Sequence, residues 1–285
     1  MYNLRYHIAS LVAVFLALAM GLLLGTIVVD RGVLSTQQAA LVSGLQKDFD
    51  EIRAESVVVR KSNATLTAFA GDVVPRLVDS VLASRTVVVI TSPENADTAG
   101  RATEVIKAGG GVVAVATFNA GDLGLADEKV AKAAGSALAV PAGSVTTSMV
   151  VEALAREWST PGDARLVTKA LVDANALKLS GLPSTSGAGG AVVACSFDGK
   201  PDGAALLLGS ALSDALRASA GVETTERGDG TAAAAVKAGL SAVDDIDTPT
   251  GQVSLTWILA GRASGFFGQG AGVDSAYPSP LFGSK

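Results

Sequence analysis

Histidine and cysteine are almost absent from this sequence. The chain of 285 residues has one histidine, His7, and one cysteine, Cys195. Because His7 lies beside an N-terminal apolar run, the rest of the chain has no imidazole for Ser-His-Asp or Cys-His catalysis, and no His-x-x-x-His pair for zinc. A single cysteine cannot form an internal disulfide. Its apolar surroundings, Ala-Val-Val-Ala-Cys-Ser-Phe, predict a buried structural thiol.

Other common functional signatures are missing as well. There is no Gly-x-x-x-x-Gly-Lys-Ser/Thr phosphate loop, and Gly268, Gly270 and Gly272 follow a helix-like segment, where a dinucleotide fingerprint would follow a strand. The net charge is −5 without a basic stripe, which argues against nucleic acid as a partner. We therefore predict no enzymatic activity and no cofactor. Aromatic residues make up only 5% of the chain, so the core must consist mainly of Ala, Val and Leu.

What the sequence does contain is a long apolar run near its N-terminus. Ile8 to Val29 are 22 residues without a charge. A helix of this length measures about 33 Å and crosses a hydrocarbon core of about 30 Å. Ala17-Leu18-Ala19 resembles a signal-peptidase site, so a cleaved signal peptide is the alternative, but the apolar run continues ten residues past Ala19. We expect an uncleaved anchor over residues 8–29, after a flank of residues 1–7.

The charges around this run give a weak orientation signal. Arg5 precedes it, and Arg31 and Lys47 follow it. A short N-terminal flank before a long translocated tail favours an N-terminus inside. The main domain is then expected outside the cytoplasm, in the cell envelope.

Small residues recur every four positions in the anchor. They are Ala13, Ala17, Gly21 and Gly25. Small side chains on one helix face allow close approach of a second helix, which would make these residues a pairing face. The alternative is that Ala and Gly are simply frequent in membrane helices.

A heptad pattern follows the anchor over residues 30–62. Its apolar seam contains Val42, Leu45, Phe49, Ile52 and Val59, with Ser56 on the same face and charged residues on the other. This pattern predicts a coiled-coil-like helix that pairs with a copy of itself, so we expect a homo-oligomer. A helix packed on its own globular domain has the same pattern, which leaves that alternative open.

The rest of the chain alternates strands and helices, and we assign residues 63–264 to one α/β domain. The expected helices cover 63–82 (bent or interrupted by Pro75), 97–108, 127–134, 145–158, 163–179, 202–219, 231–238 and 249–263. The expected strands are 86–91, 112–117, 191–197 and 222–225, with a loop over 182–190. Strand–helix–strand spacing and strands apolar on both faces predict a doubly wound, three-layer parallel sheet. The Gly/Pro/Ser-rich tail, 265–285, is expected to be loop.

One acidic cluster stands out near the end of this domain. Asp244, Asp245 and Asp247 lie within four positions, just before Thr248 and Pro249. Threonine is a favourable N-cap, proline suits the first helical position, and carboxylates favour the positive end of a helix. We therefore interpret the cluster as a helix start. Binding of a divalent cation by the three carboxylates, or docking of a partner, are the alternatives.

Two segments resemble a known family. The start, Leu4-Arg-Tyr-His7 followed by Ser10 to Gly25, is similar to that of the actinobacterial MctB family, the mycobacterial copper-transport proteins. The segment Ser241-x-Val-Asp-Asp-x-Asp-Thr-Pro-x-Gly251 is similar to the C-terminal motif of that family, and so is the region of Phe266-Phe-Gly268. The order of anchor, heptad helix and α/β domain also agrees, so the resemblance covers essentially the whole chain.

This resemblance implies a membrane-bound cell-envelope protein of copper efflux or tolerance, with copper as a transported ion. Copper(I) prefers sulfur ligands and copper(II) prefers imidazole. After the anchor the chain offers only Cys195 and Met149, so one domain cannot build a dedicated copper site, and one membrane helix cannot enclose a pore. We therefore expect the chain to act as an oligomer or together with other envelope proteins. The alternative is an envelope scaffold or partner-binding protein without transport activity.

Overall fold

The computed structural model describes residues 4–30, 33–160, 164–183, 190–195, 203–216, 218–226 and 230–279. The chain divides into two compact units, residues 1–66 and 67–285. Parts of the expected loop 182–190, the end of the expected strand 191–197 and the end of the tail lie outside the described residues.

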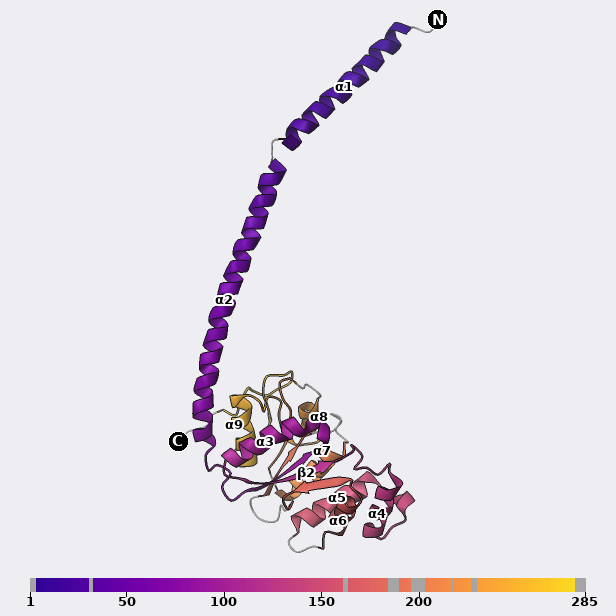
Figure 1. Ribbon diagram of the computed structural model, residues 1–285, viewed down its shortest axis with the longest axis vertical. Helices are drawn as coiled ribbons and strands as arrows, with labels where there is room; N and C mark the ends of the chain where they lie inside the picture. Colours follow the sequence, from indigo (N-terminus) through magenta and orange to yellow (C-terminus); the bar gives the residue numbers. More distant parts are fainter. Residues whose placement is uncertain are drawn as a thin grey trace. The chain divides into compact units, whose positions relative to one another are not determined.

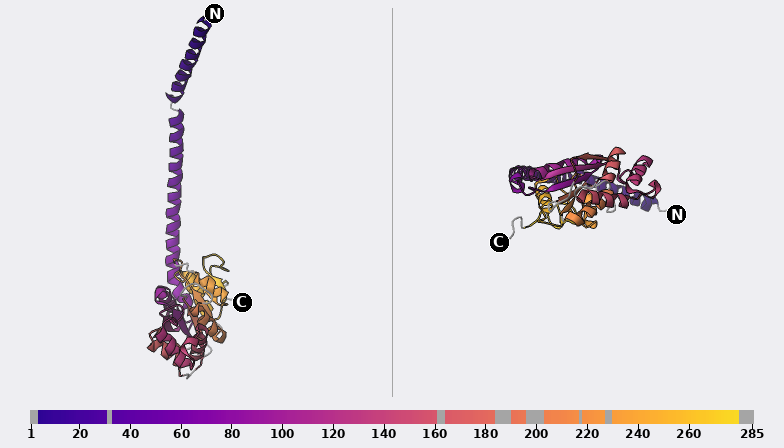
Figure 2. Two further views of the ribbon diagram at one scale, coloured as in Figure 1. Left: turned by 90° about the vertical axis from the view of Figure 1, so that its right-hand side faces the viewer. Right: turned by 90° about the horizontal axis from the view of Figure 1, so that it is seen from below.

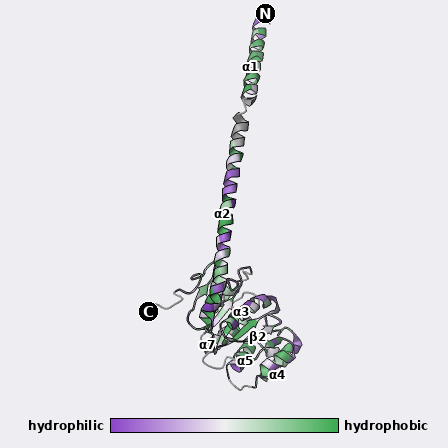
Figure 3. Cartoon of the chain, turned by 60° about the vertical axis from the view of Figure 1, so that its left-hand side comes forward, coloured by the Kyte–Doolittle hydropathy of each residue, from purple (hydrophilic) through white to green (hydrophobic). Residues whose placement is uncertain are grey.

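The first unit is helical. Helix α1 spans Leu4–Asp30, and its segment Leu4–Ile27 is long and apolar enough to cross a membrane. Figure 3 shows this continuous hydrophobic character along α1, whereas hydrophilic and hydrophobic turns alternate along α2. The length and composition of α1 agree with the predicted anchor.

Helix α2 is one continuous helix, Val33–Val78, and 46 residues long. The prediction of a separate helix over 63–82, bent or interrupted at Pro75, is therefore wrong. Pro75 lies in the last turns of α2, where only one main-chain hydrogen bond to the preceding turn is lost. The carbonyl of Pro75 still accepts a hydrogen bond from the nitrogen of Asp79 (3.1 Å). The heptad segment thus continues without a break past residue 62.

The second unit is built on a seven-stranded sheet with the order β3-β2-β1-β4-β5-β6-β7. The strands are β1 (Thr86–Thr91), β2 (Val112–Phe118), β3 (Leu177–Ser180), β4 (Gly190–Ala194), β5 (Ser219–Val222), β6 (Ser241–Val243) and β7 (Phe266–Phe267). All neighbours are parallel except β2 and β3. The chain winds from β1 in both directions, which confirms the predicted doubly wound sheet.

Helices cover both faces of the sheet. Helices α3 (Ala96–Ala108) and α9 (Pro249–Leu259) pack on one face, and the other face carries α4 (Glu128–Leu138), α5 (Thr147–Ser159), α6 (Leu166–Asp173), α7 (Ala204–Leu216) and α8 (Thr231–Lys237). Figures 1 and 2 show these layers, with β2 between α3 and the group of α4, α5 and α6. The predicted three-layer architecture is confirmed.

Alternating side chains of the strands divide the core into two layers. In β1, Val88 and Ile90 face one set of helices, and Val87 and Val89 face the other. All four are fully buried. The core consists mostly of Ala, Val and Leu, as the composition predicted, and Cys195 is buried as expected.

Three sequence-based expectations for this domain are wrong. The expected helix 163–179 ends at Asp173, and the chain then forms β3, whose Leu177 is buried against β2. Asn175 has a φ of 61°, a left-handed conformation that ends the helix. The expected strand 222–225 lies three residues earlier, as β5. The tail is not all loop, because Phe266–Phe267 pairs with β6 as the edge strand β7.

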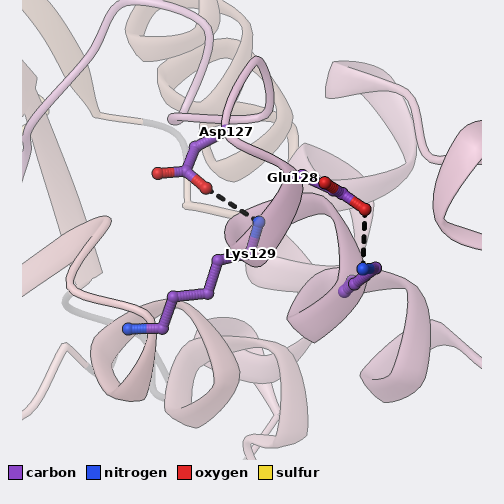
Figure 4. A network of polar contacts seen from close by, with 4 residues as sticks. Asp127, Glu128 and Lys129 are labelled. Carbon is purple, nitrogen blue, oxygen red and sulfur yellow. Dashed lines mark hydrogen bonds and ion pairs between the residues drawn. The ribbon is translucent and has the colours of Figure 1, made fainter.

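Local capping explains where α4 begins. Asp127 is its N-cap, and the Asp127 carboxylate accepts a hydrogen bond from the nitrogen of Lys129 (2.7 Å). One turn into the helix, Glu128 pairs with Lys132 at 2.6 Å. Figure 4 shows both contacts. In the part of the chain that the structure describes, this is the only ion pair.

Candidate functional site

The carboxyl ends of β5 and β6 border an open cavity of about 410 Å³. It is lined by Glu223, Thr224, Thr225, Gly230, Ala233, Asp244, Phe266, Gln269, Gly270 and Ala271. Ligand sites of open α/β sheets lie at this edge, beyond the carboxyl ends of the strands. The acidic cluster Asp244, Asp245 and Asp247 follows β6 directly.

Asp244 holds the C-terminal tail against the sheet. Its Oδ1 accepts a hydrogen bond from the nitrogen of Gln269 (2.9 Å), and its Oδ2 accepts one from the nitrogen of Gly270 (2.8 Å). A Cβ on Gly268 or Gly270 would overlap this carboxylate. The glycines of the tail therefore allow its main chain to approach Asp244 closely.

Asp245 is fully buried at the start of α9. Its Oδ2 accepts hydrogen bonds from the hydroxyls of Thr248 (2.8 Å) and Thr250 (3.1 Å) and a longer one from the side chain of Gln269 (3.4 Å). Within the described residues its Oδ1 has no hydrogen-bond partner. Burial raises the pKa of Asp245, and nearby Asp244 adds to the rise, although the hydrogen bonds oppose it.

Asp247 points to a third element, the loop after β5. Its carboxylate accepts hydrogen bonds from the nitrogen of Thr225 (2.8 Å) and from the Thr225 hydroxyl. Partial burial disfavours its charge, but these hydrogen bonds and the nearby Arg101 outweigh burial and lower the pKa of Asp247. A second cavity of about 270 Å³ lies here, lined by Asp97, Thr98, Arg101, Thr224, Glu226 and Asp247.

Glu223 is a fourth carboxylate at this edge, and the sequence-based reasoning missed it. It is buried immediately after β5, and its side chain accepts hydrogen bonds from the nitrogens of Gly230 (3.0 Å) and Ala232 (2.9 Å) at the start of α8. Its position at the end of an apolar strand was the available signal.

The geometry favours a structural role for these carboxylates. Asp244 accepts hydrogen bonds from the tail, Asp245 from the start of α9 and from Gln269 of the tail, and Asp247 from the loop after β5. Among the described residues, no group of three or more His, Cys, Asp or Glu side chains is placed to hold a metal ion. The predicted helix start is confirmed: the Thr248 hydroxyl accepts a hydrogen bond from the nitrogen of Gly251 (3.1 Å), and Pro249 is the first residue of α9.

The two predicted pairing surfaces lie on the helices of the first unit. In α1, Ala13, Ala17, Gly21 and Gly25 are exposed, and a Cβ on either glycine would meet no atom within 4 Å. In α2, the seam residues Val42, Leu45, Phe49 and Ile52 are 57–68% exposed. Both surfaces are therefore open to a partner.

Comparison with known proteins agrees with this organisation. A search of curated proteins found no match to the chain. A family model described as "Copper transport outer membrane protein, MctB" matches residues 1–278. The match includes α1, α2, the whole described sheet and the tail that covers Asp244. The chain therefore belongs to the MctB family.

Proposed function

We propose that this protein is a single-pass membrane protein of the cell envelope that contributes to copper transport, in the direction of efflux or tolerance. The observation that carries this proposal is the family match over residues 1–278, because it includes the anchor as well as the α/β domain. In our proposal the N-terminus lies inside and the α/β domain outside the cytoplasm. Copper is the cargo, and we assign no catalytic activity to the chain.

We further propose that transport depends on assembly with other chains. Copper(I) sites use thiolate and thioether ligands, and after α1 the chain has Cys195 and Met149 only. Cys195 is 1% exposed. The side chains of Asp244, Asp245 and Asp247 all accept hydrogen bonds from the protein itself, and the one unpaired oxygen, Oδ1 of Asp245, is buried, so we assign no copper ligand to these residues. One membrane helix per chain likewise requires partners to form a path for an ion.

The proposal is tested by growth of a deletion strain at increasing copper concentration. We expect the deletion to lower the tolerated copper concentration, and the native gene to restore it. Zinc is the control metal, and its tolerated concentration should not change. If copper tolerance is unchanged while the envelope is altered, the protein is an envelope scaffold and the transport proposal is wrong.

A further inference from the structure

The unbroken helix α2 extends the heptad repeat to four complete heptads. Counting in sevens from Val42 places two kinds of seam position on one face of the helix. The a positions are Val42, Phe49, Ser56 and Asn63, and the d positions are Leu45, Ile52, Val59 and Leu66. All d residues are apolar, and the polar residues of the seam lie at two a positions. This is the pattern of a coiled-coil seam.

None of the residues that the structure describes covers this seam. Residues 40–69 of α2 are all exposed, and Leu45 and Leu66 are 57% and 62% exposed. Further along α2, Val74 and Val78 are buried, and they pack with Val253 and Trp257. A contiguous apolar face of this length indicates an interaction surface.

The charges beside the seam identify the partner. Asp48 and Glu55 occupy g positions, and Arg53 and Arg60 occupy e positions. In a parallel pair of identical helices, each g residue faces the e residue of the next heptad on the other helix. Asp48 then faces Arg53 of the second copy, and Glu55 faces Arg60. An antiparallel pair would bring acidic residues together and basic residues together.

These four charges are available for such contacts. In the described part of the chain the only ion pair is that between Glu128 and Lys132, so Asp48, Arg53, Glu55 and Arg60 have no intrachain ion partner. We propose that the seam of α2 binds a second copy of this chain, as a parallel, in-register, two-stranded coiled coil. A membrane anchor at the same end of both copies imposes the same direction.

Asn63 sets the register of this pair. An asparagine at a single a position lets the two side chains bond to each other across the seam, and a shifted register would bury each one against apolar groups. Val57 and Val58 occupy b and c positions, on the side away from the seam, and stay exposed in the pair. The inference rests on the assembly part of the proposed function and does not depend on copper.

Disulfide formation in the membrane tests the arrangement. Leu45→Cys and Leu66→Cys are made separately in the full chain, and both should form disulfide-linked dimers under mild oxidation. Lys47→Cys and Lys61→Cys are matched controls at f positions and should not. The unsubstituted chain measures the background from buried Cys195. Crosslinking at neither seam position, or at only one of them, would overturn the proposal, because only a parallel, in-register pair places both residues opposite their own copies.

Charge variants test the partner directly. An acidic variant carries Arg53→Glu and Arg60→Glu, and a basic variant carries Asp48→Arg and Glu55→Arg. Each alone should reduce dimer yield through position 45 about tenfold, because attractive pairs become repulsive, and co-expression of the two should restore it. Unchanged yield in either variant, or a light-scattering mass of three chains in detergent, would contradict the proposal. Because these readouts do not involve copper, their failure is distinguishable from a failure of the copper proposal.

Discussion

The main-chain nitrogen of Gly270 donates a 2.8 Å hydrogen bond to Oδ2 of Asp244, although the two residues are 26 positions apart. Together with the bond from Gln269 to Oδ1 of Asp244, it fixes the tail at the carboxyl end of β6. The tail thereby forms one wall of the cavity of about 410 Å³. The edge of the sheet depends on residues that the sequence separates widely.

Replacement of Asp244 tests this connection. Asp244→Ala leaves two main-chain nitrogens without their acceptor, and we expect the free energy of unfolding to fall by about 1–3 kcal/mol. Urea denaturation of the full chain in detergent measures the change. Glu104→Ala removes an exposed carboxylate from α3 and should change stability by less than about 0.5 kcal/mol. Equal effects of the two substitutions would show that Asp244 does not hold the tail.

Replacement of Gly268 tests the same contact between the tail and Asp244, this time by a change in the tail. Its φ is 141°, and a Cβ at this position would overlap Oδ1 of Asp244. We expect Gly268→Ala to destabilise the fold by about 1–3 kcal/mol, from backbone strain and displaced hydrogen bonds. Gly143→Ala is the control, because a Cβ there meets no atom within 4 Å. The thermal midpoint should fall only in the Gly268 variant, and an unchanged midpoint there would contradict the geometry.

Asp245 and Asp247 should affect the pH dependence of stability with opposite signs. Burial raises the pKa of Asp245. Its contribution to the free energy of unfolding is therefore complete below about pH 3.9 and is lost as the pH rises through the folded-state pKa. The pKa of Asp247 is lowered. Its contribution to the free energy of unfolding is therefore present above about pH 3.9 and is lost as the pH falls through the folded-state pKa.

The two asparagine variants separate these effects. Relative to the native chain, Asp245→Asn should gain stability as the pH rises above about 4, by at most about 1.4 kcal/mol per pH unit. At the same pH values, Asp247→Asn should be less stable than the native chain. This difference should become smaller as the pH falls. Urea midpoints between pH 3 and 7 measure both trends. If the urea midpoints of both variants, relative to the native chain, changed in the same direction with pH, the two carboxylates would not have different environments.

The sequence predicted those features that local chemistry determines. Strand β1 was expected over residues 86–91, where it lies, because its apolar run is bounded by Arg85 and Ser92-Pro93. The start of α9 followed from Thr248 and Pro249. Strands β3, β6 and β7 were missed because they have four, three and two residues and exist only through pairing with distant strands. The contacts of Asp244, Asp247 and Glu223 were missed for the same reason, since their partners come from other segments.

Copper titration of the full chain in detergent tests the absence of a resident site. Calorimetry with copper(I) under reducing conditions should show no stoichiometric site tighter than about 1 µM, because the sulfur ligands after α1 are one cysteine and one methionine. Cys195→Ser should leave the titration unchanged, since the thiol is buried. A tight one-to-one site would show that the protein itself binds its cargo.

The copper content of whole cells tests the central claim, that this envelope protein contributes to copper transport, most directly. A deletion strain, the same strain carrying the native gene, and the parent are grown at one copper concentration, and copper per cell is measured by mass spectrometry. The account predicts that the deletion strain accumulates more copper than the parent and that the native gene restores the parental value. Equal copper content in all three strains would contradict it.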